Sequence, residues 1–290
     1  MPRRRYKKKE NINLDFIWSK GFNLIDNYAL TETGFKNNDE EIKKAIKKHN
    51  DIIYIKSGSD VITFSKYLEL IDKPKIFLFT DGDEGFPSSY PSEIVEKIIN
   101  CPMMTKLYVQ NLEREYENVK PFPIGLDLHT KGWRIGKKPI KKVEYMLKLN
   151  YQKDKKDLIL IDCYMSRDRH SDREKSIKIL ENCQHVNILK ERKSIGKILK
   201  LYSEHKFVLS PHGAGLDCHR TWEVLLAGST PIVKTSILDS LYQDLPVIIV
   251  KDWEECKDLN FLLDKYNQLK TLTNREYIKG KFSYSYWLNK

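Results

Sequence analysis

Short apolar runs alternate with amphipathic segments from residue 51 onward. In the first half, three runs have the length and the isoleucine, leucine and aromatic content of buried strands: 51–56, 75–80 and 106–111. Between them, apolar residues recur at helical spacing, which predicts helices over 60–71, capped by Asp60, and over 91–99. Residues 119–128 carry two prolines, so we expect a loop or an edge strand there.

A second series follows the polar stretch 148–157. Five apolar runs predict strands: 158–164, 186–190, 207–210, 230–234 and 246–251. Five amphipathic segments predict helices: 172–183, 194–205, 217–227, 236–243 and 254–269. Continuous apolar strands that alternate with helices are typical of parallel sheets covered on both faces. We therefore predict an α/β protein with two Rossmann-like domains, whose parallel sheets face a central cleft.

The polar stretch also sets the predicted domain boundaries. A chain of 290 residues is long enough for two domains. We expect a basic leader at 1–10, an N-terminal domain at 11–150 and a C-terminal domain at 151–270. The last segment, 271–290, is expected to pack back on the N-terminal domain.

Composition narrows the class of protein. No run approaches the roughly 18 apolar residues of a membrane-spanning helix, and no apolar stretch follows the basic leader as it does in a signal peptide. The five cysteines are scattered, so we expect free thiols in a reducing compartment, most simply the cytoplasm. The net charge of +11 fits a nucleic-acid or polyanion partner, a phosphate-binding patch, or an ordinary lysine-rich surface. No nucleic-acid-binding motif favours the first of these.

The stretch FVLSPHGAGLDCHRTWEVLLAG (207–228) carries the most chemistry. A predicted strand ends at a turn that contains Gly213 and Gly215, and a predicted helix follows. In open α/β sheets, ligands bind at the carboxyl ends of strands, and a helix N-terminus favours anions. On the helix, Arg220 and Glu223 are three residues apart and share a face. An arginine there can neutralise a diphosphate and a carboxylate can accept ribose hydroxyls, although an ordinary surface ion pair has the same spacing.

The C-terminal half resembles exostosin-type glycosyltransferases, that is, glycosyltransferase family 47 and its viral and bacterial relatives. The similarity lies in the Gly-rich turn, Arg-x-x-Glu on a helix, Gly-x-x-Pro, and the later LYQDLPVIIVKDWEE. Weaker similarity extends to IKSGSD, LYVQN and PFPIGLD, so that the resemblance spans about residues 50–260. The short form is most similar to glycosyltransferases of large algal viruses, including xylosyltransferase-like members.

That resemblance implies a GT-B fold and an inverting transfer from a UDP-sugar to the hydroxyl of an oligosaccharide or glycoprotein glycan, with no essential metal or other cofactor. UDP-xylose is the leading donor by resemblance alone. By matching positions, Glu223 would bind the donor ribose and Arg220 the phosphates, with His212 and Gly213 at the phosphate turn. The turn after the strand at 158–164 adds arginines beside the same cleft, of which we favour Arg167 and Arg173.

An inverting transfer needs a base for the acceptor hydroxyl. Strand ends in the N-terminal half offer Asp60, Asp81, Asp83 and Glu84. Asp60 also reads as a helix cap, whereas Asp81 and Asp83 have no such local duty, so we favour Asp83 or Asp81 as the base. Asp60 is placed with the acceptor-binding candidates. At the end of the next strand, two amides are candidates for orienting acceptor hydroxyls: Gln110 and Asn111.

Two other functions remain open. Asp81-Gly82-Asp83 is an Asp-x-Asp after an apolar strand, as in metal-dependent GT-A-type glycosyltransferases, and an Asp-Gly pair is also common in plain turns. In that case the nucleotide would bind in the first half of the chain, and EDTA would abolish activity. A non-enzymatic polyanion binder would instead lose its binding steeply with salt and on removal of residues 1–10.

Overall fold

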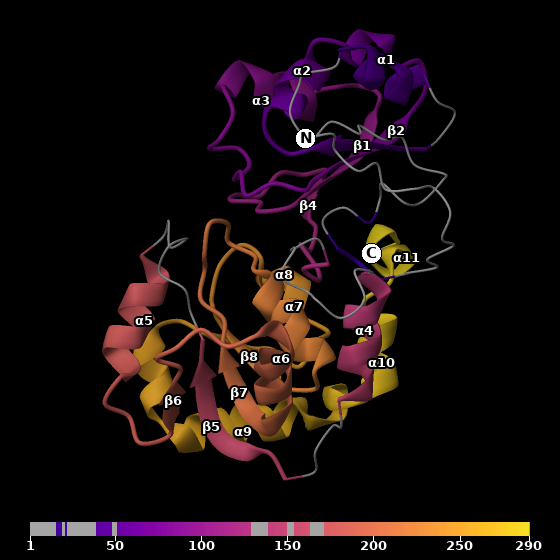
Figure 1. The fold of residues 1–290 in the computed structure, drawn as a ribbon. Helices are drawn as coiled ribbons and strands as arrows, with labels where there is room; N and C mark the ends of the chain where they lie inside the picture. The colour runs from indigo at the N-terminus through magenta and orange to yellow at the C-terminus, as the bar shows by residue number, and fades with distance from the viewer. Residues whose placement is uncertain are drawn as a thin grey trace, which may run out of the picture.

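The structure is a computed structural model, which describes residues 16–18, 21, 39–47, 51–128, 139–149, 154–162 and 171–289. The predicted basic leader and Arg167 lie outside these residues. The described chain forms two lobes, one above the other in Figure 1, each built on a parallel sheet. Within the described residues, no helix is both long and apolar enough to cross a membrane.

The N-terminal lobe contains the first sheet. Its four parallel strands follow the order β1-β2-β3-β4: β1 (Ile52–Lys56), β2 (Lys75–Thr80), β3 (Met104–Val109) and β4 (Val119–Pro121). Its helical segments are α1 (Asp39–Lys47), α2 (Ser59–Ser65), the 3-10 helix η2 (Leu68–Leu70) and α3 (Ser92–Ile99). The three strands predicted in the first half are confirmed as β1, β2 and β3, and the proline-containing segment supplies the short edge strand β4.

Alternation along these strands separates the two faces of the sheet. Phe77 and Phe79 of β2 face α2, where the ring of Phe64 meets both of them edge-on. Leu78 pairs in register with Tyr54 of β1 and Tyr108 of β3. Tyr54, Leu78 and Tyr108 lie on the opposite face of the sheet. On that face the Tyr108 hydroxyl donates to the Leu288 carbonyl of the last helix.

The C-terminal lobe contains five parallel strands in the order β6-β5-β7-β8-β9. These are β5 (Lys156–Ile161), β6 (Val186–Ile188), β7 (His205–Leu209), β8 (Thr230–Lys234) and β9 (Ile248–Val250). The helical segments between and after them are α5 (Asp172–Leu180), α6 (Ile195–Glu204), α7 (His219–Leu226), α8 (Asp239–Tyr242), η4 (Trp253–Lys257), α9 (Leu259–Leu269) and η5 (Lys270–Thr273). Every predicted strand of the second series is present.

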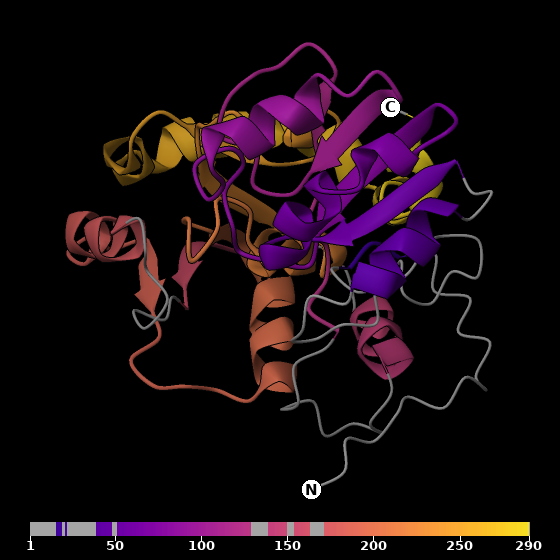
Figure 2. The same cartoon turned by 90° about the horizontal axis from the view of Figure 1, so that it is seen from above.

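Both faces of this sheet are covered. Ile159 and Ile161 of β5 belong to the core beneath α5 and α9, whereas Leu160 belongs to the core shared with α6 and α7. Two covered faces explain why the strands are continuous apolar runs. The predicted α/β class with two Rossmann-like parallel sheets is therefore confirmed. Figure 2, viewed from above, shows the N-terminal lobe in front of the C-terminal lobe, with α5 extending past its edge.

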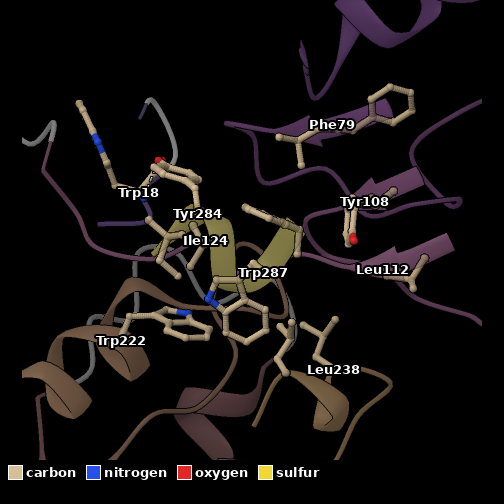
Figure 3. Close-up of a cluster of buried hydrophobic side chains, with 14 of the residues drawn as sticks. Trp18, Phe79, Tyr108, Leu112, Ile124, Trp222, Leu238, Tyr284 and Trp287 are labelled. Carbon is tan, nitrogen blue, oxygen red and sulfur yellow. Dashed lines mark hydrogen bonds between the residues drawn. The ribbon is translucent and has the colours of Figure 1, made fainter. Parts of the chain in front are cut away.

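The end of the chain packs between the lobes. Helices α10 (Arg275–Gly280) and α11 (Tyr284–Leu288) follow η5, and the indole of Trp287 lies edge-on against Trp222 of α7 at 5.7 Å. The Leu288 carbonyl accepts a hydrogen bond from the Tyr108 hydroxyl of β3. Figure 3 shows Trp287 between these two neighbours. The core that contains Leu160 and Trp287 consequently runs through both lobes.

Several details differ from the sequence predictions. Helix α2 has Gly58 as its N-cap, with φ of 102°, so the prediction that Asp60 caps this helix is wrong. Glycine tolerates this backbone conformation, and Asp60 lies inside the first turn. The predicted helix over 60–71 breaks into α2 and η2. Helix α4 (Pro139–Lys148), which the sequence patterns did not predict, contacts the C-terminal lobe through the bond from the Tyr145 hydroxyl to the Gly196 carbonyl.

Candidate functional site

The carboxyl ends of the two sheets meet at Asn111. This residue follows β3 in a left-handed conformation, with φ of 56°. Its Oδ1 accepts a hydrogen bond from the Asp217 backbone N–H, at 3.1 Å, in the turn after β7. Its Nδ2 donates to the Gly82 carbonyl, at 3.4 Å, in the loop after β2. Asn111, predicted to orient the acceptor, thus connects the loops at which ligands of parallel sheets bind.

The strand order of the C-terminal lobe marks a topological switch point between β5 and β7. The chain leaves β5 toward β6 on one side and leaves β7 toward β8 on the other, and in open α/β sheets ligands bind at the point where the outgoing loops separate in this way. Asp162 follows β5 directly, and Ser210–Cys218 follows β7; we call the latter segment the glycine turn. The predicted donor-binding residues of the C-terminal half lie at or beside this switch point, apart from Arg167, which is not described.

The glycine turn has no room for side chains at its two glycines. A Cβ on Gly213 would overlap the guanidinium of Arg173, and one on Gly215 would lie 2.5 Å from Asn111 Nδ2. The Gly213 N–H donates to the Gly215 carbonyl at 3.0 Å, which closes the turn. Close packing of an arginine and an asparagine, one from each side, therefore accounts for both glycines.

Arg173 and Asp172, at the start of α5, hold the glycine turn in place. Arg173 is 8% exposed and donates from Nε to the His212 carbonyl at 3.2 Å. Asp172 accepts the His212 backbone N–H at 3.1 Å and the Trp253 indole N–H at 2.8 Å. The structure thus brings together three predicted donor residues: Arg173, His212 and Gly213. It places a buried positive charge directly against the turn.

Arg220 is anchored to the end of β5. Its Nε donates to Asp162 Oδ1 at 2.6 Å, and the Tyr202 hydroxyl donates to Asp162 Oδ2 at the same distance. Burial, followed by the charge of Asp162, raises the pKa of Tyr202 well above its ordinary value. Asp162 was missed in the sequence, although it is the polar residue that ends the apolar run LILI. The ion pair fixes the guanidinium at the switch point.

Glu223 forms a buried ion pair with Lys142 of α4. The two side chains are 13% and 3% exposed, and Lys142 Nζ lies 2.5 Å from Glu223 Oε1. Lys142 Nζ also donates to the Asp127 carbonyl. Within the described chain, no hydrogen bond engages Glu223 Oε2, and that oxygen is not buried. One carboxylate oxygen is thereby held in place while the other remains open to a ligand. No sequence pattern distinguished Lys142 from its neighbouring lysines.

Asp217 is the buried centre of the lobe contact. Its carboxylate accepts the backbone N–H groups of Ile124, at 2.8 Å, and Cys218, at 2.9 Å, together with the indole N–H of Trp222. The Tyr242 hydroxyl is 3.3 Å away. Burial raises the pKa of Asp217 to about 6, because desolvation outweighs the hydrogen bonds that favour the charged form. No sequence pattern marked Asp217 as part of a site.

The raised pKa of Asp217 predicts a pH-dependent contribution to stability. An acid whose folded pKa exceeds its unfolded pKa stabilises the fold most below the unfolded value, near 3.8, and loses that contribution as pH rises through about 6. Two pKa units correspond to about 3 kcal/mol. Relative to Asp217→Asn, the free energy of unfolding of the wild type should fall by about this amount between pH 4 and pH 7. Urea denaturation at each pH measures the difference, and a constant difference contradicts it.

The N-terminal side of the junction is acidic. Asp81 and Asp83 follow β2, and Asp81 adopts a left-handed conformation with φ of 64°. Burial, and then the charge of Asp81, raises the pKa of the Tyr54 hydroxyl of β1. Gln110 is 1% exposed and donates to the Gly82 carbonyl at 2.6 Å. Asp60, 6% exposed, lies at the carboxyl end of β1. Among the described residues, no group of three or more histidine, cysteine or acidic side chains is arranged to hold a metal ion.

Comparisons with known proteins give structural neighbours only. No family model and no curated protein sequence matches the chain. A UDP-forming α,α-trehalose-phosphate synthase from Burkholderia xenovorans is similar with a TM-score of 0.45 and 11% identity, over 86% of this chain and 77% of that one. A glycosyltransferase from Rickettsia africae has a TM-score of 0.43 and 15% identity, over 90% and 81%. An α1,3-fucosyltransferase has a TM-score of 0.40 and 12% identity, over 82% and 78%. Scores of this size assign the chain to none of these groups, so its function is inferred from its own residues.

Proposed function

We propose that the protein is an inverting glycosyltransferase of the GT-B type that moves a sugar from a UDP-sugar to a glycan hydroxyl without an essential metal. The observation that carries this proposal is the junction at Asn111. There the switch point of one parallel sheet, with Arg220 and Glu223 on the helix that follows, meets the acidic carboxyl end of the other. The exostosin-type sequence resemblance points the same way, and UDP-xylose is the proposed donor on that resemblance alone.

The C-terminal lobe supplies the donor side of this proposal. The glycine turn leads into α7, which offers backbone N–H groups to an anion. The cations against the switch point are Arg173 and Arg220, and both guanidiniums are held by partners. Fixed positive charge near the leaving diphosphate stabilises the transition state without reorganisation. These arginines are the proposed substitute for a metal ion.

Glu223 is the proposed ribose-binding residue. A carboxylate oxygen that accepts from ribose hydroxyls discriminates a nucleoside from other phosphates. Lys142 holds Oε1, so that Oε2 is presented in a fixed direction. Lys142 is thus proposed as a positioning residue for the donor site.

The N-terminal lobe supplies the acceptor side. In a single displacement, the acceptor oxygen attacks the anomeric carbon, the bond from that carbon to the phosphate oxygen breaks, and a base takes the hydroxyl proton. The loop after β2 faces the glycine turn across Asn111, and it contains three of the candidate bases: Asp81, Asp83 and Glu84. Gln110 and Asp60 lie at the same sheet edge as proposed acceptor-binding residues. The four described cysteines are free, which supports a reducing compartment such as the cytoplasm.

Thermal-shift and calorimetric titrations test the proposal. We expect UDP and one UDP-sugar to raise the melting temperature by mass action, and UDP-sugar turnover to survive EDTA. Turnover that EDTA abolishes and only Mn²⁺ or Mg²⁺ restores would establish the metal-dependent alternative. A protein that binds no UDP but binds heparin with a steep salt dependence would be a polyanion binder instead.

A further inference from the structure

Two buried oxygen atoms near Gly82 have no hydrogen-bond partner in the described chain. One is Oε2 of Glu84 and the other is Oε1 of Gln110. Gln110 is 1% exposed, and its Nε2 is already bonded to the Gly82 carbonyl, so its amide is fixed on the loop. A buried acceptor without a donor costs about 1–3 kcal/mol. Two of them at one sheet edge indicate a place where a ligand supplies the donors.

Gly82 makes room for the Glu84 carboxylate. A Cβ on Gly82 would overlap Glu84 Oε2, whereas a Cβ on Gly58 would make an ordinary contact with Glu84 Oε1 at 3.4 Å. The carboxylate therefore rests over the loops that follow β1 and β2. Its Oε1 is neither hydrogen-bonded nor buried, so one oxygen points into the loop and the other reaches solvent. A side chain at position 82 would displace the carboxylate from this place.

Glu84 is better placed than either neighbouring aspartate to take a proton. Asp81 lies at a left-handed position in the turn after β2, and no unpartnered buried oxygen marks it. Asp83 is half-buried, and no unpartnered buried oxygen marks it. Glu84 combines an oxygen that lacks a donor with one that is accessible, beside a second unpartnered acceptor.

We propose that Glu84 is the catalytic base and that Gln110 binds the same acceptor hydroxyl group or its neighbour. The inference rests on the proposed glycosyl transfer and identifies the acceptor as a compound that presents hydroxyl donors. The hydroxyl oxygen forms the new bond to the anomeric carbon, and the bond from that carbon to phosphate breaks with its electron pair on the diphosphate. The hydroxyl proton passes to Glu84, whose accessible oxygen later releases it to water.

The test uses Glu84→Gln, which keeps the shape of the side chain and removes its basicity. With UDP-xylose as donor, we expect the transfer of xylose to water and to methyl glycoside acceptors to fall about 100- to 10,000-fold, measured as UDP release. UDP affinity, measured by calorimetry, should stay within about twofold of the wild type, because the donor site lies on the other lobe. Azide carries no proton, so glycosyl azide formation should continue at close to the wild-type rate. Gln110→Leu should raise the KM for the glycoside more than it lowers kcat.

Glu93→Gln is the matched control, since Glu93 is exposed on α3 in the same lobe; it should match the wild type. If Glu84→Gln transfers the sugar to hydroxyl acceptors at the normal rate, the inference is overturned. It is also overturned if transfer to azide falls as much as transfer to hydroxyls. If Asp83→Asn loses sugar transfer to hydroxyls and Glu84→Gln does not, the base is Asp83. A wild-type protein that neither binds UDP nor releases it from UDP-xylose overturns the proposed function itself, and this inference with it.

Discussion

Replacing Glu223 by alanine is expected to weaken UDP binding about 10- to 100-fold, because hydrogen bonds to a charged group are worth roughly 1.5–3 kcal/mol. The loss should be specific to the nucleoside: inorganic diphosphate, which has no ribose, should bind the variant and the wild type equally. Isothermal titration calorimetry with UDP and with diphosphate measures both. Equal UDP affinity in the two proteins removes Glu223 from the donor site.

The ion pair with Lys142 complicates this substitution. Alanine leaves the Lys142 ammonium buried with the Asp127 carbonyl as its remaining described acceptor, which destabilises the fold as well as the site. Glu223→Gln keeps an acceptor for Lys142 and removes only the charge, so it separates the two effects. Glu181→Ala, at an exposed carboxylate beyond the end of α5, is the matched control and should change neither stability nor UDP affinity.

Replacing Asp217 by alanine is expected to lower the free energy of unfolding by about 3–5 kcal/mol. Three N–H groups would lose their acceptor: those of Ile124, Cys218 and the Trp222 side chain. Asp217 is 3% exposed, so water does not readily replace the carboxylate. Urea denaturation at pH 7, where most Asp217 carboxyls are charged, measures the loss.

Two variants calibrate the effect of Asp217→Ala. Asp217→Asn keeps one acceptor oxygen and should lose less stability. Asp264→Ala, at an exposed position on α9, should stay within about 0.5 kcal/mol of the wild type. A loss in Asp217→Ala no larger than that of Asp264→Ala would show that the lobes do not depend on this carboxylate.

The sheets were predictable because buried parallel strands are continuous apolar runs. KIFLFT corresponds residue for residue to β2, and TPIVK to β8. Helix α4 was not predictable in this way: Lys142, at a position that reads as solvent-facing, is buried by an ion pair with a residue 81 positions away. Sequence spacing contains no information on such a contact.

The residues of the candidate site were likewise predictable only in part. Arg220 and Glu223 were selected because helical spacing places them on one face, and the structure gives each a partner from a different element. Gly213 was assigned by resemblance to a phosphate turn, whereas the structure shows both glycines of the turn packed against Arg173 and Asn111. Asp60 was misread as a cap, because a glycine with positive φ begins α2. Local patterns identified residue types, and long-range packing decided what they contact.

The contact of α11 with both lobes has a consequence for biosynthesis. A chain made from its N-terminus completes β3 long before it reaches Leu288, 180 residues after Tyr108. Until then the Tyr108 hydroxyl lacks its bond to the Leu288 carbonyl. The face of the sheet that contains Tyr108 also lacks the cover that α11 supplies. Domains usually fold as they emerge from the ribosome, but here the N-terminal sheet lacks its contact with α11 until Leu288 has been made. During that interval the nascent protein carries an uncovered apolar face, the stage at which chaperones act.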